Sequence, residues 1–178
     1  SKLIIITDLI NRKFYCDYLI NFNFGSSRKL YSQSFIKNEL LLGTKYYPLR
    51  FNFRKNLNKN HSRFNKNINS FLISLGSNGD EYLLLKILLC LFSIKKQFKI
   101  QIIAGSNNLK IINNFIKKNK VNKKIEILNK RYDLDVIYKK NFFYIGGSGV
   151  TLYESIFFGL IPFPIITANN QRYAVNQM

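Results

Sequence analysis

The residues best suited to chemistry form a glycine-rich run, Gly146–Glu154, with the sequence Gly-Gly-Ser-Gly-Val-Thr-Leu-Tyr-Glu. It follows an apolar stretch typical of a strand and leads into a helical pattern. Glycine and serine before a helix N-terminus leave backbone N–H groups available, and the positive end of the helix dipole favours an anion such as pyrophosphate. The run matches neither the dinucleotide fingerprint nor the Walker sequence. Glu154, one turn into the helix, would be placed to accept hydrogen bonds from the two hydroxyls of a ribose.

The same spacing also fits a structural capping box. In that interpretation Thr151 is the N-cap residue, and the Glu154 carboxylate bonds back to the Thr151 backbone amide. The spacing alone leaves both interpretations open.

A second small-residue turn, Gly76–Asp80 (Gly-Ser-Asn-Gly-Asp), also leads from an expected strand into an expected helix. Gly76 and Ser77 would let backbone amides approach a phosphate. The alternative is an ordinary strand-to-helix turn in which Asp80 caps the helix.

Side-chain amides follow the last expected strand, in Thr167–Gln171. Because amides both donate and accept, Asn170 and Gln171 could bind sugar hydroxyls, although a simple turn fits equally well. His61, the only histidine, lies in a polar stretch and is expected to be a solvated loop residue. The sequence contains no carboxylate pair, nucleophile triad or metal-ligand cluster, so we assign neither a catalytic residue nor a metal site.

These turns belong to a regular alternation of strands and helices, which predicts an α/β fold with a parallel sheet covered on both faces. Such sheets bind ligands beyond the carboxyl ends of their strands. The helix from Asp80 is apolar almost all round, and we expect it to be deeply packed. The expected strands are 71–75, 99–104, 124–128, 142–145 and 161–165, and the expected helices are 80–94, 108–118, 132–139 and 151–158.

Three segments follow from this pattern. Residues 1–54 show short apolar runs (3–7, 18–20 and 40–42) and suit the end of an α/β domain whose beginning is missing. Residues 55–69 are rich in Asn and Lys and predict a linker, and residues 70–178 predict a Rossmann-type domain. Neither end carries a start or stop signal, so we expect the chain to be part of a longer protein.

The formal net charge of +19 raises nucleic acid as a partner. We do not adopt that interpretation, because Lys, Asn, Ile, Phe and Tyr are enriched together and the lysines are dispersed in pairs rather than gathered in one stripe. No run of roughly 18 uncharged apolar residues exists, so no membrane span is expected. Two cysteines without metal-ligand spacing favour a reducing cytoplasm.

The order of segments resembles the PseG family of UDP-sugar hydrolases, which are relatives of the GT-B fold. The stretches Asp8–Arg12 and Cys16–Asn23 are similar to the family's "D-L-x-x-R … D-x-L-I-N-x-N" region. Leu41–Phe53 is similar to its "L-L-G-P-x-Y-x-x-L-R-x-x-F" region. Generic glycosyltransferases of this fold lack these two regions.

Two further stretches carry the resemblance into the second half of the chain. Ile73–Asp80 is similar to "I-S-x-G-G-x-D", and Gly149–Glu154 together with Asn170–Gln171 matches the family's "G-G-V/S-T-x-x-E … N-Q" signature. The resemblance therefore covers most of the chain, and it implies a GT-B-like arrangement in which the end of one α/β domain precedes a nucleotide-sugar domain.

The resemblance implies hydrolysis of a UDP-linked diacetamido-trideoxyhexose in pseudaminic acid biosynthesis, with inversion at the anomeric carbon and without a metal or cofactor. It places the ribose on Glu154 and the sugar on Asn170 and Gln171. The family's catalytic histidine lies near the start of its first domain and has no counterpart here, so the chain would bind UDP without turnover. The residues implied for the pyrophosphate are Gly76, Ser77, Ser148, Gly149, Val150 and Thr151.

Three alternatives remain open at this point. A glycosyltransferase resembling the peptidoglycan enzyme MurG would share the glycine loop, the ribose glutamate and the terminal glutamine. A non-catalytic homologue would bind a UDP-sugar without turnover. A nucleic-acid-binding protein would account for the charge, and it predicts salt-sensitive binding to any polyanion.

Overall fold

The computed structural model describes residues 1–10, 12–56, 67–76, 80–105, 108–120, 124–128 and 133–178. The chain folds into two compact units. Unit 1 comprises Ser1–Arg54 together with Ala168–Met178, and unit 2 comprises Lys55–Thr167. The predictions for His61, for Ser77 and for most of the linker fall outside the described residues.

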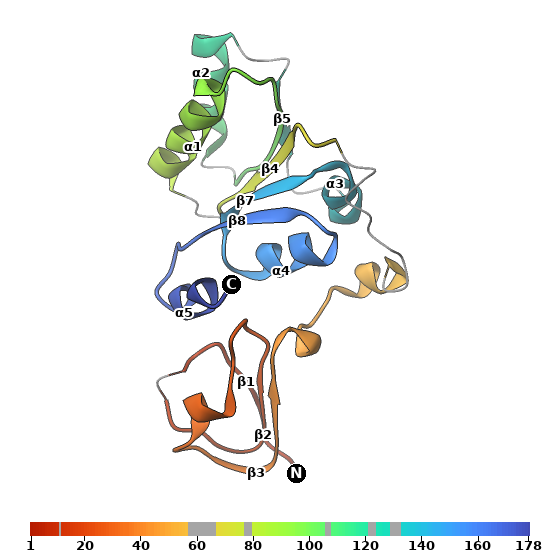
Figure 1. Ribbon diagram of the computed structural model, residues 1–178, viewed down its shortest axis with the longest axis vertical. Coiled ribbons are helices and arrows are strands. Elements are labelled where there is room, and N and C mark those ends of the chain that lie inside the picture. Colours follow the sequence, from red (N-terminus) through yellow and green to blue (C-terminus); the bar gives the residue numbers. More distant parts are fainter. Residues whose placement is uncertain (11, 57–66, 77–79, 106–107, 121–123, 129–132) are drawn as a thin grey trace. The chain divides into compact units, whose positions relative to one another are not determined.

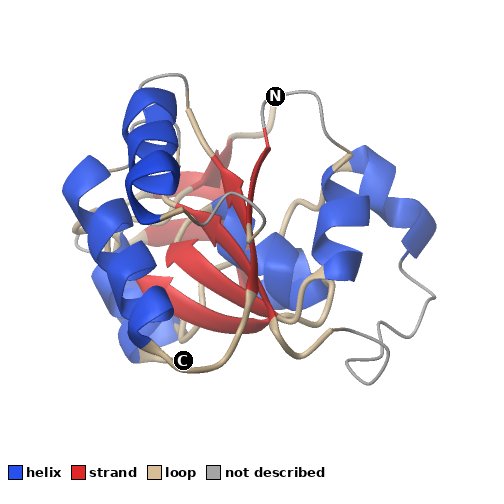
Figure 2. Ribbon diagram, turned by 90° about the horizontal axis from the view of Figure 1, so that it is seen from above, coloured by secondary structure: helices blue, strands red, loops and turns tan. Residues whose placement is uncertain are grey.

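Unit 2 contains a five-stranded sheet in the order β6-β5-β4-β7-β8, and all of its strand pairs are parallel. Helices lie on both sides of the strands (Figures 1 and 2). This arrangement is Rossmann-like and confirms the predicted α/β class. The elements are β4 (Ser70–Ser74), α1 (Glu81–Ser93), β5 (Lys99–Ile103), α2 (Leu109–Asn119), β6 (Ile125–Leu128), α3 (Leu134–Lys140), β7 (Phe143–Gly147), α4 (Val150–Phe157) and β8 (Ile161–Ile165).

The core of unit 2 forms because the strands are apolar on both faces. On one face, Ile73 and Ile102 pack with the buried side chains of α1 and α2, including Leu88 and Ile112. The central strand β4 is buried at all five positions. Each expected strand and helix of this unit is present within one or two residues of its predicted bounds.

Helix α1 is less buried than its composition predicts, and the expectation of deep packing on all sides is wrong. Leu84, Leu88 and Leu91 are buried on one face. On the other side, Tyr82 and Leu89 are 67% and 57% exposed. Apolar residues around a whole helix therefore do not imply burial around the whole helix in this chain.

Unit 1 contains a three-stranded parallel sheet in the order β1-β2-β3. Its strands are β1 (Ile4–Ile6), β2 (Tyr15–Asn21) and β3 (Phe35–Leu42), and short 3-10 turns follow at Arg28–Tyr31, Thr44–Tyr46 and Phe51–Asn56. One face of this sheet packs around Cys16, Leu19 and Tyr31. The predicted short runs in this region are thus strands, and two of them are longer than expected.

The opposite face of the unit 1 sheet is open. Ile4, Ile6, Tyr15 and Phe35 are each more than half exposed, at 57%, 62%, 69% and 65%. Parallel sheets in α/β proteins are ordinarily covered on both faces. Within the described residues, unit 1 therefore has an uncovered apolar sheet face.

The C-terminal helix α5 (Gln171–Asn176) belongs to unit 1 and was not foreseen from the sequence. It is fixed beyond the carboxyl ends of β1 and β2. The Tyr173 hydroxyl donates to the Gly25 carbonyl at 3.0 Å, and the Asn170 side chain donates to the Asp8 carboxylate. No helix in the described ranges is long and apolar enough to cross a membrane.

Candidate functional site

The topology of unit 2 creates a switch point between β4 and β7. The chain runs outward from β4 to β5 and β6 and then returns to β7 on the other side of β4. Ser74 at the end of β4 is aligned with Gly146 near the end of β7. Ligands of open α/β sheets bind at such a point, beyond the carboxyl ends of the strands. Two turns that the sequence predicted separately, after β4 and after β7, thus leave the sheet from neighbouring strand ends.

At the β4 end, Gly76 is exposed and has a φ of 86°, a conformation that favours glycine. Asp80 is the N-cap residue of α1, and its carboxylate accepts from the Tyr82 and Leu83 amides at 2.8 and 3.2 Å. The structural interpretation of this turn is therefore correct for Asp80. A carboxylate already occupies the α1 N-terminus and opposes an anion there.

At the β7 end, Gly146 is required by its neighbours inside the protein. A Cβ atom placed on Gly146 would lie 2.0 Å from the Ser74 carbonyl oxygen and 2.5 Å from the Tyr144 hydroxyl oxygen. The first glycine of the run thus makes room for Tyr144 and for close strand pairing.

Gly149 differs from Gly146 in its surroundings. It is exposed, and a Cβ atom placed on it would meet no atom within 4 Å. Gly149 is the N-cap residue of α4 and provides no side-chain cap. Helix α4 begins at Val150, two residues earlier than the capping-box interpretation requires, so Thr151 is not the N-cap. Gly149 thus brings no side-chain oxygen of its own to the α4 N-terminus, whereas Asp80 does so at α1.

Ser148 lies between these two glycines and is buried. Its hydroxyl donates to the Ile165 carbonyl oxygen, at 3.0 Å, at the end of β8. This hydrogen bond ties the turn to β8. The predicted role of Ser148 in phosphate binding would therefore rest on its backbone amide rather than on its hydroxyl.

Glu154 lies in the middle of α4 and is fully buried, with an exposed fraction of 0%. Its Oε2 atom accepts from the Tyr138 hydroxyl at 2.8 Å, and the Tyr138 ring stacks on Phe158. A buried carboxylate must be hydrogen-bonded to be tolerated. A ribose that used Glu154 would have to compete with Tyr138 for this oxygen.

Tyr144 gives the site a dependence of stability on pH. Burial, and secondarily the Glu154 charge, raise the pKa of the Tyr144 hydroxyl above its ordinary value. Above about pH 10 the unfolded chain releases this proton while the folded chain keeps it. The contribution of Tyr144 to the free energy of unfolding is therefore fully present below that pH. Above it, the free energy of unfolding falls by about 1.4 kcal/mol per pH unit for one tyrosine.

We therefore expect the free energy of unfolding, measured in urea between about pH 8 and pH 11, to fall less steeply above pH 10 in Tyr144→Phe than in the wild type. Tyr15→Phe is the matched control, because Tyr15 is 69% exposed. Equal slopes in the wild type and Tyr144→Phe would contradict this assignment.

Asn170 and Gln171 belong to unit 1, whereas the glycine-rich turn belongs to unit 2. Gln171 is the first residue of α5. Asn170 contacts Asp8, which belongs to another of the stretches that resemble the family. The structure thus brings together two separate parts of the predicted pattern within unit 1.

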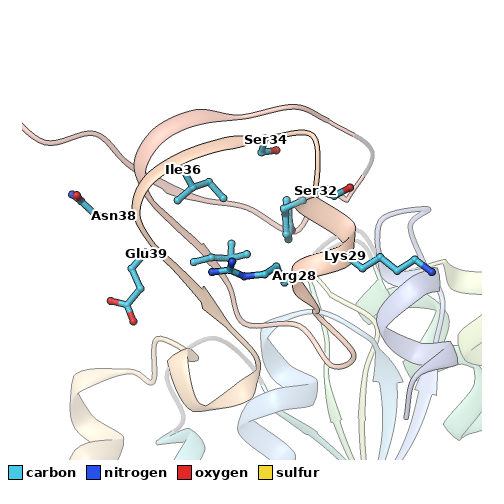
Figure 3. A pocket seen from close by; sticks show the side chains of 9 residues that line it. Arg28, Lys29, Ser32, Ser34, Ile36, Asn38 and Glu39 are labelled. Carbon is cyan, nitrogen blue, oxygen red and sulfur yellow. The ribbon is translucent and has the colours of Figure 1, made fainter.

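Unit 1 also contains a pocket that the sequence did not indicate. It has a volume of about 340 Å³ and lies between the first 3-10 turn and β3 (Figure 3). Arg28, Lys29 and Glu39 are among its lining residues, so its charges are of both signs. Neither Gly149 nor Glu154 lines this pocket.

Sequence reasoning missed Tyr138, whose hydroxyl donates to Glu154, and Tyr144, whose hydroxyl contacts the carbonyl oxygens of Ser74 and Gly147 at the two strand ends. Tyr138 lies 16 positions before Glu154, so no local spacing relates the two. A signal was present for Tyr144, because a buried tyrosine needs a hydrogen-bond partner and the glycine two positions later leaves space beside the ring.

The fold and the site define a class of protein: a two-unit α/β protein with parallel sheets, in which a glycine-capped helix begins at the switch point of the larger, Rossmann-like sheet. No family model matches the chain. Over 161 residues the chain is 29% identical to an uncharacterized protein of Methanocaldococcus jannaschii. The match covers 87% of this chain and 33% of that protein, so the chain spans about a third of its relative's length.

Proposed function

We propose that this chain binds the UDP moiety of a nucleotide-linked sugar at the carboxyl edge of the five-stranded sheet. The observation that carries the proposal is the N-terminus of α4. It begins at the switch point, is capped by Gly149 without a side chain, and leads just over one turn later to the buried carboxylate of Glu154. The N-terminus of α1 offers a poorer anion site, because Asp80 already caps it.

In this proposal the pyrophosphate binds the backbone amides of Gly149, Val150 and Thr151, where the helix dipole favours negative charge. Val150 and Glu154 are four residues apart, which separates them by roughly 6 Å along the helix axis. This spacing suits a ligand that presents a phosphate and a ribose in succession. Glu154 would then exchange its hydrogen bond with Tyr138 for hydrogen bonds from the ribose.

The resemblance to the PseG family supports a reaction for the longer protein. We propose that it hydrolyses a UDP-linked diacetamido-trideoxyhexose to the free sugar and UDP, in pseudaminic acid biosynthesis in the cytoplasm. Asn170 and Gln171 would contact the sugar. The role that we propose for this chain in that reaction is nucleotide binding.

The test is a calorimetric titration of the folded chain with UDP and with inorganic pyrophosphate, at low and raised salt. We expect saturable one-to-one binding that is tighter for UDP than for pyrophosphate. The reason is that pyrophosphate lacks the ribose hydroxyls that would donate hydrogen bonds to Glu154. Competition with excess uridine monophosphate and then with duplex DNA serves as the control for nucleotide specificity.

A folded chain that ignores UDP would contradict the proposal. So would equal binding of UDP, pyrophosphate and DNA with steep loss at raised salt, since that pattern indicates a general polyanion surface. A MurG-like transferase would also bind UDP, and it differs in requiring an acceptor before the longer protein releases UDP from the nucleotide sugar.

A further inference from the structure

The hydroxyl of Tyr144 lies where the two strands of the switch point end. Its oxygen is 2.9 Å from the Gly147 carbonyl oxygen on β7 and 3.3 Å from the Ser74 carbonyl oxygen on β4. Gly147 is followed by the turn that caps α4, and Ser74 is followed by the Gly76 turn. One buried hydroxyl therefore contacts the last residue of each strand.

The ring of Tyr144 reaches this position by passing across Gly146. A Cβ atom on Gly146 would lie 2.8 Å from the Cζ atom of the ring, so a larger residue there would displace the tyrosine. Tyr144 itself is fully buried. The Gly146 position and the Tyr144 side chain thus form one packed unit beneath the switch point.

The Tyr144 hydroxyl can connect the Ser74 and Gly147 carbonyl groups by hydrogen bonding, and we call this connection the Tyr144 joint. A phenol carries one proton, which both carbonyl oxygens can share or take in turn, and the shorter distance favours Gly147. A tyrosine hydroxyl keeps its proton throughout the neutral range, and burial raises the pKa of Tyr144 further. On the other side of the turn, Ser148 bonds to Ile165 on β8. The turn before α4 is consequently anchored to both neighbouring strands of the sheet.

We propose that Tyr144 is a positioning residue of the nucleotide site, which fixes the α4 N-terminal turn against the end of β4 so that its amides converge on the pyrophosphate. This inference rests on the proposed function. Tyr144 itself does not touch the ligand. Its effect passes through the backbone of Gly147 to the turn at Gly149.

The test compares Tyr144→Phe with Tyr138→Phe, because each variant removes one hydroxyl from a buried tyrosine of unit 2. Dissociation constants are measured for UDP and for uridine monophosphate, and the ratio of the monophosphate constant to the UDP constant reports the contribution of the second phosphate. We expect Tyr144→Phe to weaken UDP binding roughly three- to tenfold and to lower this ratio, since one hydrogen bond behind the turn is lost. We expect Tyr138→Phe to leave the ratio unchanged, because Tyr138 contacts Glu154 on the ribose side.

The outcomes separate the two hypotheses. If the wild type binds UDP and Tyr144→Phe retains the wild-type ratio, the positioning role is wrong and the proposed function stands. If both variants lower the ratio equally, a general loss of packing explains the effect, and the specific role of Tyr144 is also overturned. If the wild type does not bind UDP, the proposed function fails.

A measurement without ligand tests the joint itself. Amide hydrogen exchange of the free protein should become faster in Tyr144→Phe for the segments after both β4 and β7, and for neither in Tyr138→Phe. Unchanged exchange in both segments would overturn the joint whether or not UDP binds. Thermal unfolding of both variants establishes that the comparison is made on folded protein.

Discussion

Replacing Gly146 with alanine is expected to lower the free energy of unfolding by about 3 kcal/mol or more, at the upper end of the range for overpacked sites. A Cβ atom at this position would lie 2.0 Å from the backbone oxygen of Ser74, which cannot move without separating β4 from β7. It would also lie 2.5 Å from the Tyr144 hydroxyl. Urea denaturation monitored by circular dichroism would measure the loss.

Gly149→Ala is the matched control for this prediction. A Cβ atom on Gly149 would meet no atom within 4 Å, and its φ of −96° lies outside the left-handed region that favours glycine. We therefore expect a change of only a few tenths of a kcal/mol, the usual difference between glycine and alanine outside special positions being under about 1 kcal/mol. If the two variants lost equal stability, crowding at Gly146 would not be the reason for that glycine.

Replacing Glu154 with alanine is expected to weaken UDP binding by on the order of 10- to 100-fold, the effect of losing one or two hydrogen bonds to a charged group. The reason is that the Glu154 carboxylate accepts the ribose hydroxyls in the proposed complex. Calorimetric titration with UDP and with 2′-deoxy-UDP would measure this effect, and the variant should discriminate less between the two ligands.

Two variants separate ribose binding from the structural role of Glu154. Glu154→Gln keeps the size of the side chain and an oxygen that can accept from Tyr138, but it removes the charge. Tyr138→Phe removes the hydroxyl that donates to Glu154 and keeps the carboxylate. If Glu154→Ala bound UDP as tightly as the wild type, while remaining folded, the ribose assignment would be wrong.

The architecture of unit 2 could be predicted from the sequence because its signals are local and repeated. Uninterrupted apolar runs such as 71–73 and 142–145 indicate strands buried in a parallel sheet. Gly76 and the glycines of 146–149 mark the turns between strand and helix. The sequence could also assign Asp80 as an N-cap, since the carboxylate stands directly before a helical pattern.

Features that depend on tertiary contacts could not be predicted in the same way. The sequence does not reveal which glycine of the run makes room for an internal side chain, because this depends on Ser74 on the neighbouring strand. The contact of Glu154 with Tyr138 joins two helices across 16 positions. The exposed side of α1 was missed because apolar residues also occur on protein surfaces. An apolar residue type alone therefore does not show that the side chain is buried.

The uncovered apolar face of the unit 1 sheet has a consequence for colloidal behaviour. This face is an exposed apolar patch that favours self-association, on a chain whose formal net charge is +19. Its residues are Ile4, Ile6, Tyr15 and Phe35. At low ionic strength, mutual repulsion keeps such particles apart, and added salt shortens the range of that repulsion to about 8 Å near physiological concentration. The concentration of salt, rather than the intrinsic stability of the fold, would then set the limit at which solutions of this chain become turbid.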